Sequence, residues 1–291
     1  MNILDGKATA EQIKEEIKTQ VAHFIDDGFR PPHLAAVLVG NDPASETYVR
    51  NKEKNSKLVG FTSSVYNLPI DTPENELLKV IDFLNDDPDV DGFIVQLPLP
   101  KHIDEQKIIN AIDPKKDVDG FNPINIGKMV LGLDTYLPAT PSGIIELLKR
   151  NKIETVGKHA VIIGRSNIVG TPLSILLSRK NDFANCTVTI CHSQTPNIQE
   201  FSLQADILVA AIGKPSFVTA DMVKEGAIVI DVGINTIPDN TKKSGFRTVG
   251  DVDFDEVSKK ASWITPVPGG VGPMTIACLF DNLIEMYKRN V

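Results

Sequence analysis

The chain has 291 residues, of which 42% are hydrophobic and 23% are charged, as in a globular protein with room for roughly two domains. Its formal net charge of −8 argues against nucleic acid and against an anionic membrane surface as partners. An anionic ligand must therefore be captured by local groups, because the overall field repels it.

Strand-length apolar runs alternate with helix-length amphipathic segments, which is the pattern of βαβ units in a parallel sheet. In the first half, Asp42 is a good N-cap and Pro43 suits the first helical position, so a helix is expected from there to about Val59. Thr72 and Pro73 repeat the same signal. The remaining elements expected in this half are strands 34–39, 62–67 and 92–97, helices 72–85 and 104–111, and a loop over 113–123.

The second half continues the alternation. Thr140 and Pro141 give another cap-plus-proline start, for a helix to about Arg150. Apolar residues spaced by three and four mark one face of a last helix, 276–287. The other expected elements are strands 159–163, 187–191, 207–212, 227–231 and 262–265 and helix 169–178. The chain therefore reads as an α/β protein with parallel sheets.

Several classes of protein are disfavoured by what the sequence lacks. Cys186, Cys191 and Cys278 form neither a metal-binding spacing nor an even disulfide set. The N-terminus has no signal-peptide pattern, and no apolar run approaches the length of a membrane span. We expect a cytoplasmic protein with no bound metal and no membrane or nucleic-acid partner.

A strand leading into a glycine-containing turn and then a helix, around Gly164, is the strongest dinucleotide signal. Gly164 and Gly170 are six apart and do not form the G-x-G-x-x-G fingerprint, so a purely structural turn is the alternative. The next strand ends without an acidic residue for a ribose 2′-hydroxyl. Arg165 and Ser193 offer instead a cation and a hydroxyl suited to a 2′-phosphate, which favours NADP over NAD.

Polar residues near strand ends in the first half are candidates for a ligand site. Tyr48 and Lys52 are four apart on the helix after Asp42 and share a face. Gln96 ends a strand, and Asp119 lies in the loop that follows the next helix. Each also has an ordinary structural interpretation: a solvated helix face, a hydrogen-bonding glutamine, a turn aspartate. None of them alone identifies a reaction.

The segment Ile264–Thr275 is rich in glycine and proline and precedes the last helix. Proline fixes φ, and glycine lets the backbone approach another group closely. Such a loop either connects two elements rigidly or presents main chain to a ligand.

Five segments, in this order, together resemble the bifunctional methylenetetrahydrofolate dehydrogenase/cyclohydrolase (FolD) family over essentially the whole chain: Tyr48–Lys52, Val95–Pro100, Asp117–Phe121, Gly164–Gly170 and Pro266–Thr275. The resemblance implies two α/β domains flanking a cleft, the second a Rossmann-type NAD(P)-binding domain. It places residues 1–139 with 274–291 in the catalytic, folate-binding domain and 140–273 in the NADP-binding domain, with the C-terminal helix returning to the first. It also implies a homodimer.

The implied chemistry is oxidation of 5,10-methylenetetrahydrofolate by NADP⁺, followed by hydrolysis of the methenyl product to 10-formyltetrahydrofolate. The substrate is a small folate, with or without a polyglutamate tail. The resemblance assigns catalysis to Lys52 as base, Tyr48 as a stacking ring and Asp119 as acceptor for the pterin. Gln96 would either orient Lys52 or polarise the attacked centre. The same four residues bind substrate together with Leu97, Pro268 and Gly269. The cofactor-binding residues it implies are Gly164, Arg165, Ser166, Ser193 and Ile234.

Two other functions stay open at this point. One is a dehydrogenase without cyclohydrolase activity, against which the presence of Lys52 and Gln96 argues. The other is a folate- or nucleotide-binding module without catalysis, whose signature would be degenerate catalytic positions; here they are intact.

Overall fold

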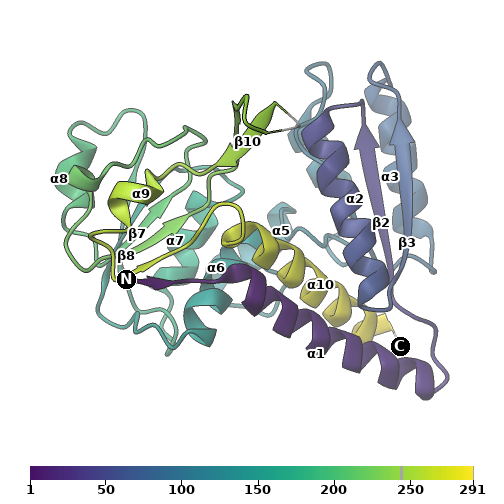
Figure 1. Ribbon diagram of the computed structural model, residues 1–291. Helices are drawn as coiled ribbons and strands as arrows, with labels where there is room; N and C mark the ends of the chain where they lie inside the picture. The colour runs from purple at the N-terminus through teal and green to yellow at the C-terminus, as the bar shows by residue number, and fades with distance from the viewer. Residues whose placement is uncertain (243–244, 291) are drawn as a thin grey trace. The chain divides into compact units, whose positions relative to one another are not determined.

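The computed structural model describes residues 1–242 and 245–290, and the chain divides into two compact units (Figure 1). Unit 1 comprises residues 1–11 and 140–275, and unit 2 comprises residues 12–139 and those from 276 onward. The first residues belong to unit 1 because β1 (Asn2–Ile3) pairs in parallel with β11 (Trp263–Ile264). The domain limits expected from the sequence stay a prediction.

Unit 1 is built on a six-stranded, all-parallel sheet with the order β1-β11-β8-β7-β5-β6. Its central strands are β5 (His159–Ile163), β6 (Thr187–Cys191), β7 (Ile207–Ala210) and β8 (Ile228–Asp231). The chain builds from β5 to β6 on one side and then to β7 on the other. That reversal makes the carboxyl ends of β5 and β7 the point where doubly wound sheets bind ligands.

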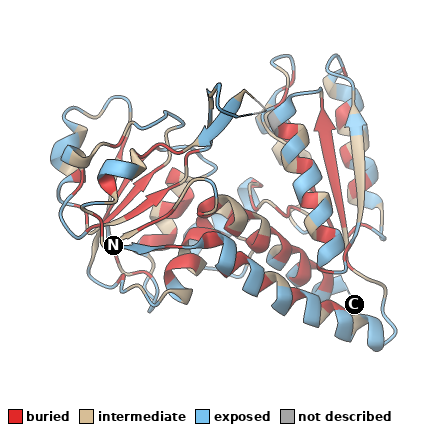
Figure 2. Ribbon diagram, viewed as in Figure 1, coloured by how far each residue is buried: buried red, intermediate tan, exposed pale blue. Residues whose placement is uncertain are grey.

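Helices and a hairpin complete unit 1. The elements are α6 (Ala139–Arg150), α7 (Gly170–Ser178), α8 (Ile198–Ser202), η1 (Ala220–Met222), α9 (Phe254–Val257) and the antiparallel pair β9 (Asn235–Pro238) and β10 (Phe246–Val249). Val161, Leu208 and Val229 of three adjacent strands pack in one apolar cluster with Val218 and Val257. Figure 2 shows these strands buried along their length.

Unit 2 has a three-stranded parallel sheet of order β3-β2-β4, with β2 (His33–Val39) at its centre. Ala35, Val37 and Val39 alternate along β2 and pack with Leu77 and Ile81 of α3, so α3 covers this face. The other elements are β3 (Thr62–Leu68), β4 (Gly92–Val95), α2 (Pro43–Leu58), α3 (Glu74–Asp86), α4 (Glu105–Ala111) and α5 (Pro123–Leu131). Two long helices, α1 (Gly6–Asp26) and α10 (Val271–Asn290), begin in unit 1 and continue in unit 2.

The α/β class, the parallel sheets, the Rossmann-like arrangement and the return of the C-terminal helix to the first-half unit are confirmed. Helices α1, α5, α8 and α9 and strand β1 are additions to the predicted elements. Two predicted caps are wrong. The N-cap of α3 is Pro73, because the Thr72 hydroxyl donates instead to the carbonyl of Pro69. Thr140 lies inside α6, which begins at Ala139, so it does not cap that helix. The last helix starts at Val271, five residues before the expected position. Within the part of the chain that the structure describes, no helix is both long and apolar enough to span a bilayer.

Candidate active site

Helix α2 places Tyr48 and Lys52 in unit 2. The Asp42 side chain accepts a hydrogen bond from the Ser45 backbone N–H at 2.8 Å, and Pro43 occupies the first turn, which confirms the predicted start. From this cap the helical period sets Tyr48 and Lys52 one above the other. The cap therefore fixes where both side chains point.

Lys52 is almost completely buried, which is unusual for a lysine. Only 3% of its surface is exposed. Its Nζ lies 4.7 Å from the centroid of the Tyr48 ring and 4.0 Å from Oδ1 of Asp119. Burial lowers the pKa of Lys52, and the Asp119 carboxylate only partly opposes that change. Burial and the same carboxylate raise the pKa of Tyr48, which keeps it a neutral phenol.

The loop that carries Asp119 is held in place by hydrogen bonds to Asp117, two residues earlier. Asp117 is buried and accepts hydrogen bonds from the backbone N–H groups of Gly120 and Asn122 and from the Asn125 side chain. Burial raises the pKa of Asp117 to about 6. Gly120 has φ +73°, and a Cβ there would lie 2.6 Å from the Leu137 carbonyl carbon. The loop thus has one tightly determined conformation, and it brings Asp119 to Lys52.

Gln96 follows β4 directly, at the carboxyl edge of the sheet. Its backbone N–H donates to Val37, and its Nε2 donates to the Leu97 carbonyl at 2.7 Å. Its Oε1 is buried, and none of the described residues provides it with a donor. Lys52 thus lies close to both Tyr48 and Asp119, whereas Gln96 donates hydrogen bonds to Val37 and Leu97. An unpaired buried acceptor costs about 1–3 kcal/mol, so it marks a place where a ligand donor is expected.

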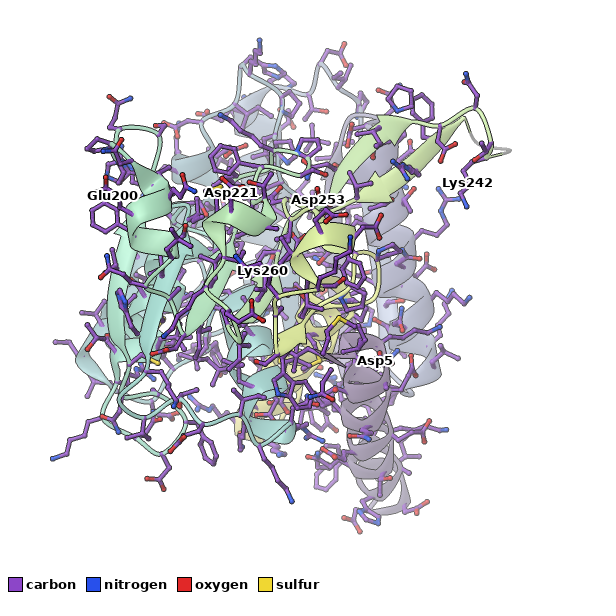
Figure 3. The ribbon with its side chains drawn as sticks, turned by 60° about the vertical axis from the view of Figure 1, so that its left-hand side comes forward. Asp5, Glu200, Asp221, Lys242, Asp253 and Lys260 are labelled. Carbon is purple, nitrogen blue, oxygen red and sulfur yellow. The ribbon has the colours of Figure 1, made fainter. Side chains whose placement is uncertain are left out.

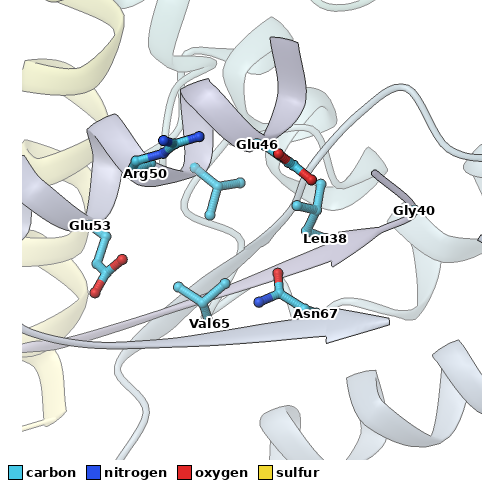
Figure 4. Close-up of a pocket in the computed structure, with 8 residues that line it drawn as sticks. Leu38, Gly40, Glu46, Arg50, Glu53, Val65 and Asn67 are labelled. Carbon is cyan, nitrogen blue, oxygen red and sulfur yellow. The ribbon is translucent and has the colours of Figure 1, made fainter. Parts of the chain in front are cut away.

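Unit 2 also has a surface pocket of about 330 Å³ between α2 and strands β2 and β3 (Figure 4). It lies on the side of α2 that does not carry Tyr48 and Lys52. No residue predicted for the site lines it. Its walls combine an apolar floor with two carboxylates and one guanidinium: Leu38, Gly40, Glu46, Val49, Arg50, Glu53, Val65 and Asn67.

In unit 1, the turn after β5 packs so closely against neighbouring backbone that two of its positions leave no space for a Cβ. Gly164 has φ +129°, and a Cβ there would overlap the carbonyl oxygen of Ala211. A Cβ on Gly170 would overlap the carbonyl oxygen of Gly164. Two glycines are therefore required for the close approach of β5, the turn and α7, although they do not match the G-x-G-x-x-G spacing.

Arg165, Ser166 and Ser193 surround this turn with exposed polar groups. The Ser166 hydroxyl oxygen accepts a hydrogen bond from the Val169 N–H at 3.1 Å, so this side chain also orders the entry to α7. Ser193 follows β6, which pairs with β5 in register with Ile163 opposite Cys191. Both strands end at the same edge, where their next residues offer a cation and hydroxyl groups to a phosphate.

The remaining predicted residues of unit 1 also lie at the carboxyl ends of strands. Ile234, after β8, exposes 64% of an apolar side chain. Pro268 and Gly269 follow β11, and the Gly269 carbonyl accepts a hydrogen bond from the backbone N–H of Lys7, at the start of α1, at 2.8 Å. A Cβ on Gly6 would overlap the carbonyl of Gly270, so the glycine-rich loop is clamped against this helix.

Sequence reasoning missed three buried carboxylates that hold these loops, Asp117, Asp231 and Asp251. In residues 1–242 and 245–290, no cluster of three or more histidine, cysteine or acidic side chains is arranged to hold a metal ion.

Comparisons with known proteins cover both units. Residues 138–291 match the family model described as "Tetrahydrofolate dehydrogenase/cyclohydrolase, NAD(P)-binding domain", and residues 4–119 match "Tetrahydrofolate dehydrogenase/cyclohydrolase, catalytic domain". The "Bifunctional protein FolD" of Cytophaga hutchinsonii is 61% identical over 285 residues, which cover 98% of each chain.

Two solved structures have the same fold. The bifunctional FolD methylenetetrahydrofolate dehydrogenase/cyclohydrolase from Campylobacter jejuni superposes with a TM-score of 0.92 at 48% identity and covers 100% of both chains. The Trypanosoma brucei methylenetetrahydrofolate dehydrogenase-cyclohydrolase, complexed with NADP cofactor and inhibitor, also gives a TM-score of 0.92, at 38% identity over 98% of this chain and 96% of that one.

Proposed function

The chain belongs to the tetrahydrofolate dehydrogenase/cyclohydrolase family, and on that premise we propose how its residues divide the family's two reactions. It is a bifunctional enzyme. It oxidises 5,10-methylenetetrahydrofolate to the 5,10-methenyl compound with NADP⁺ and hydrolyses that product to 10-formyltetrahydrofolate. The observation that carries the assignment of roles is the buried Lys52 against Tyr48 and Asp119.

Lys52 is the proposed base of the hydrolysis. Water attacks the methenyl carbon and loses a proton, which a neutral amine can accept and an ammonium cannot. Burial already lowers the pKa of Lys52, and a cationic substrate beside it would lower this pKa further. The Tyr48 ring, which lies over the amine, offers a flat surface on which an aromatic part of the folate can stack.

Asp119 and Gln96 are the proposed polar contacts of the folate. A carboxylate pairs well with the two parallel N–H donors of a pterin edge. Oδ1 of Asp119 is 4.0 Å from Nζ of Lys52, which is longer than a direct hydrogen bond and leaves this oxygen able to accept from the folate. The unpartnered Oε1 of Gln96 supports a substrate-facing role. Leu97, Pro268 and Gly269 stay proposed contacts along the folate.

Unit 1 fits NADP. Gly164 and Gly170 allow β5, the turn and the start of α7 to pack closely, as at a turn that binds a pyrophosphate, and the exposed Arg165, Ser166 and Ser193 suit a 2′-phosphate. The exposed apolar Ile234 suits the face of a flat ring. The bound cofactor supplies the hydride acceptor. The protein's own task in this step is to position two flat ligands, and it requires no acid or base.

One assay tests the function. Purified protein with methylenetetrahydrofolate and NADP⁺ is followed for NADPH and methenyl absorbance together. Formation of NADPH without accumulation of the methenyl compound is the expected result. Accumulating methenyl product would favour a dehydrogenase without cyclohydrolase activity, and no NADPH at all would favour a non-catalytic binding module.

We also propose that the chain forms homodimers and that its folate can carry a polyglutamate tail. Both proposals rest on the family resemblance. Light scattering on the purified protein measures the first, and the KM for mono- and polyglutamylated substrate measures the second.

A further inference from the structure

Two buried carboxylates link the loops at the carboxyl edge of the six-stranded sheet in unit 1. Asp251 has no exposed surface. Its Oδ2 accepts hydrogen bonds from the backbone N–H groups of Ile212 and Gly213 at 2.7 and 2.9 Å. Its Oδ1 accepts from the Lys214 N–H at 2.9 Å and from the Asn235 side chain at 2.8 Å. One side chain therefore fixes three consecutive residues after β7 and one residue after β8.

Asp231, the last residue of β8, continues the network. Its carboxylate accepts from the N–H groups of Gly233, Asp251 and Val252, at 2.9, 2.8 and 3.0 Å. Its own N–H donates to the Thr265 hydroxyl at 2.7 Å, at the start of the glycine-rich loop after β11. The loops that follow three neighbouring strands are thus joined through Asp231 and Asp251.

Two glycines are required for this arrangement. A Cβ on Gly233 would overlap the Asp251 carboxylate, and a Cβ on Gly250 would overlap the Asp231 carboxylate. Among the described residues, the four donors to the buried Asp251 carboxylate are neutral amides, three from the backbone and one from the Asn235 side chain. Packing alone does not require such a buried carboxylate, because replacing buried charged groups by apolar residues of similar volume often leaves stability unchanged or raises it.

The residue at the centre of the network is Ile234. Its two neighbours are held directly, Gly233 by Asp231 and Asn235 by Asp251, while Ile234 itself is 64% exposed. An exposed apolar side chain between two fixed residues is a contact surface with a defined position. It lies on the sheet edge where α/β proteins bind dinucleotides.

We propose that Asp251, supported by Asp231, is a positioning residue for the dehydrogenase reaction: it holds the loops after β7 and β8 so that Ile234 meets the reactive end of the cofactor. This inference rests on the proposed function. It assigns to Asp251 no contact with cofactor or substrate. It makes the network specific to one of the two activities, because Lys52, Tyr48 and Asp119 belong to unit 2.

The test is the substitution Asp251→Asn, which replaces one carboxylate oxygen by an NH₂ group. This group must then face one of two pairs of donors: those of Lys214 and Asn235, or those of Ile212 and Gly213. Losing charge-assisted hydrogen bonds of about 1.5–3 kcal/mol corresponds to about 10- to 100-fold in affinity. We expect the KM for NADP⁺ and the Kd for NADPH, measured by its fluorescence, to rise at least about tenfold on this basis. Hydrolysis of supplied methenyltetrahydrofolate, which needs no cofactor, should stay within about twofold in kcat/KM because its residues lie in unit 2.

Asn235→Ala is the milder second variant, since it removes one donor and leaves no new group facing the carboxylate. It should raise the same KM about 3- to 10-fold, as expected for one hydrogen bond to a charged group. Asp221→Asn is the matched control. Asp221, labelled in Figure 3, is an exposed carboxylate of unit 1 that also accepts hydrogen bonds, from Thr219 and Gln199, and its variant should match the wild type.

A parallel loss of both activities in both variants would overturn the proposal in favour of a general folding role. Unchanged NADP⁺ KM and NADPH affinity would overturn it as well. Failure of the proposed function is a separate result, because it would be seen as absence of NADPH formation in the wild-type protein.

Discussion

Replacing Lys52 by methionine should separate the two activities. The methionine side chain has nearly the length of the lysine stem, so the packing of a residue that is only 3% exposed is largely kept. What is lost is the amine that lies 4.7 Å from the Tyr48 ring centroid and 4.0 Å from Asp119. The cofactor residues Gly164, Arg165 and Ile234 belong to the other unit and are unchanged.

The expected loss of hydrolysis rate in Lys52→Met follows from the proposed role of Lys52 as a general base. A positioned general base contributes about 10²- to 10⁴-fold to the rate, which corresponds to about 3–5 kcal/mol of activation free energy. Hydrolysis of supplied methenyltetrahydrofolate should therefore fall about 10³-fold in kcat. The variant should be no less stable to heat than the wild type, because the desolvation that lowers the pKa of Lys52 is removed with the charge.

The assay follows the decay of methenyl absorbance, corrected for the spontaneous reaction, and compares it with NADPH binding on the same samples. Lys57→Met is the matched control: this lysine is on the same helix, but its side chain is 66% exposed and pairs with Glu53 at 2.7 Å. Equal loss of hydrolysis and NADPH affinity in Lys52→Met would refute the reasoning, since it would make the lysine a structural residue.

Three further predictions concern the cofactor turn and the buried carboxylates. Arg165→Ala should raise the KM for NADP⁺ about 10- to 100-fold, as for loss of a charge-assisted hydrogen bond, and leave the KM for NAD⁺ unchanged; an unaltered preference would place the 2′-phosphate elsewhere. Gly164→Ala, whose Cβ would overlap the Ala211 carbonyl and displace the turn, should abolish measurable NADPH binding and spare methenyl hydrolysis; normal binding by fluorescence would contradict the role of this turn in cofactor binding. Burial raises the pKa of Asp117 from 3.8 to about 6, so the folded state holds this proton more tightly than the unfolded one. The stabilisation is present below about pH 4 and is lost as the pH rises through about 6. Asp117→Asn should therefore make the unfolding free energy in urea fall less over this interval, and an identical pH dependence would show that Asp117 does not titrate there.

Local signals in the sequence predict most of the fold, and the same kind of signal is present at the start of α5, which was not among the expected elements. Asp42 and Pro43 begin α2 as expected. Asn122 and Pro123 form the same kind of start for α5, where the Asn122 side chain accepts from the Ile124 N–H at 2.9 Å. The failed cap at Thr72 has the opposite cause, because its hydroxyl is used within a turn.

The site could be predicted only in part. The i,i+4 spacing brings Tyr48 and Lys52 to one helix face, but no spacing rule connects them to Asp119, sixty-seven residues after Lys52 along the chain. The folate chemistry came from the family resemblance alone. Asp251 was missed because an aspartate after glycine in a sequence reads as a turn residue, and its burial depends on the meeting of loops after β7, β8 and β10.

The most direct test of the central claim, that Lys52 acts as a neutral amine, is an NMR titration of the lysine ε-amines in isotope-labelled protein, with Lys52→Met to assign the signal. The account predicts that the Lys52 amine loses its proton at a pH clearly below that of the exposed lysines, since burial lowers its pKa. A Lys52 amine that titrates together with the exposed lysines would contradict the account.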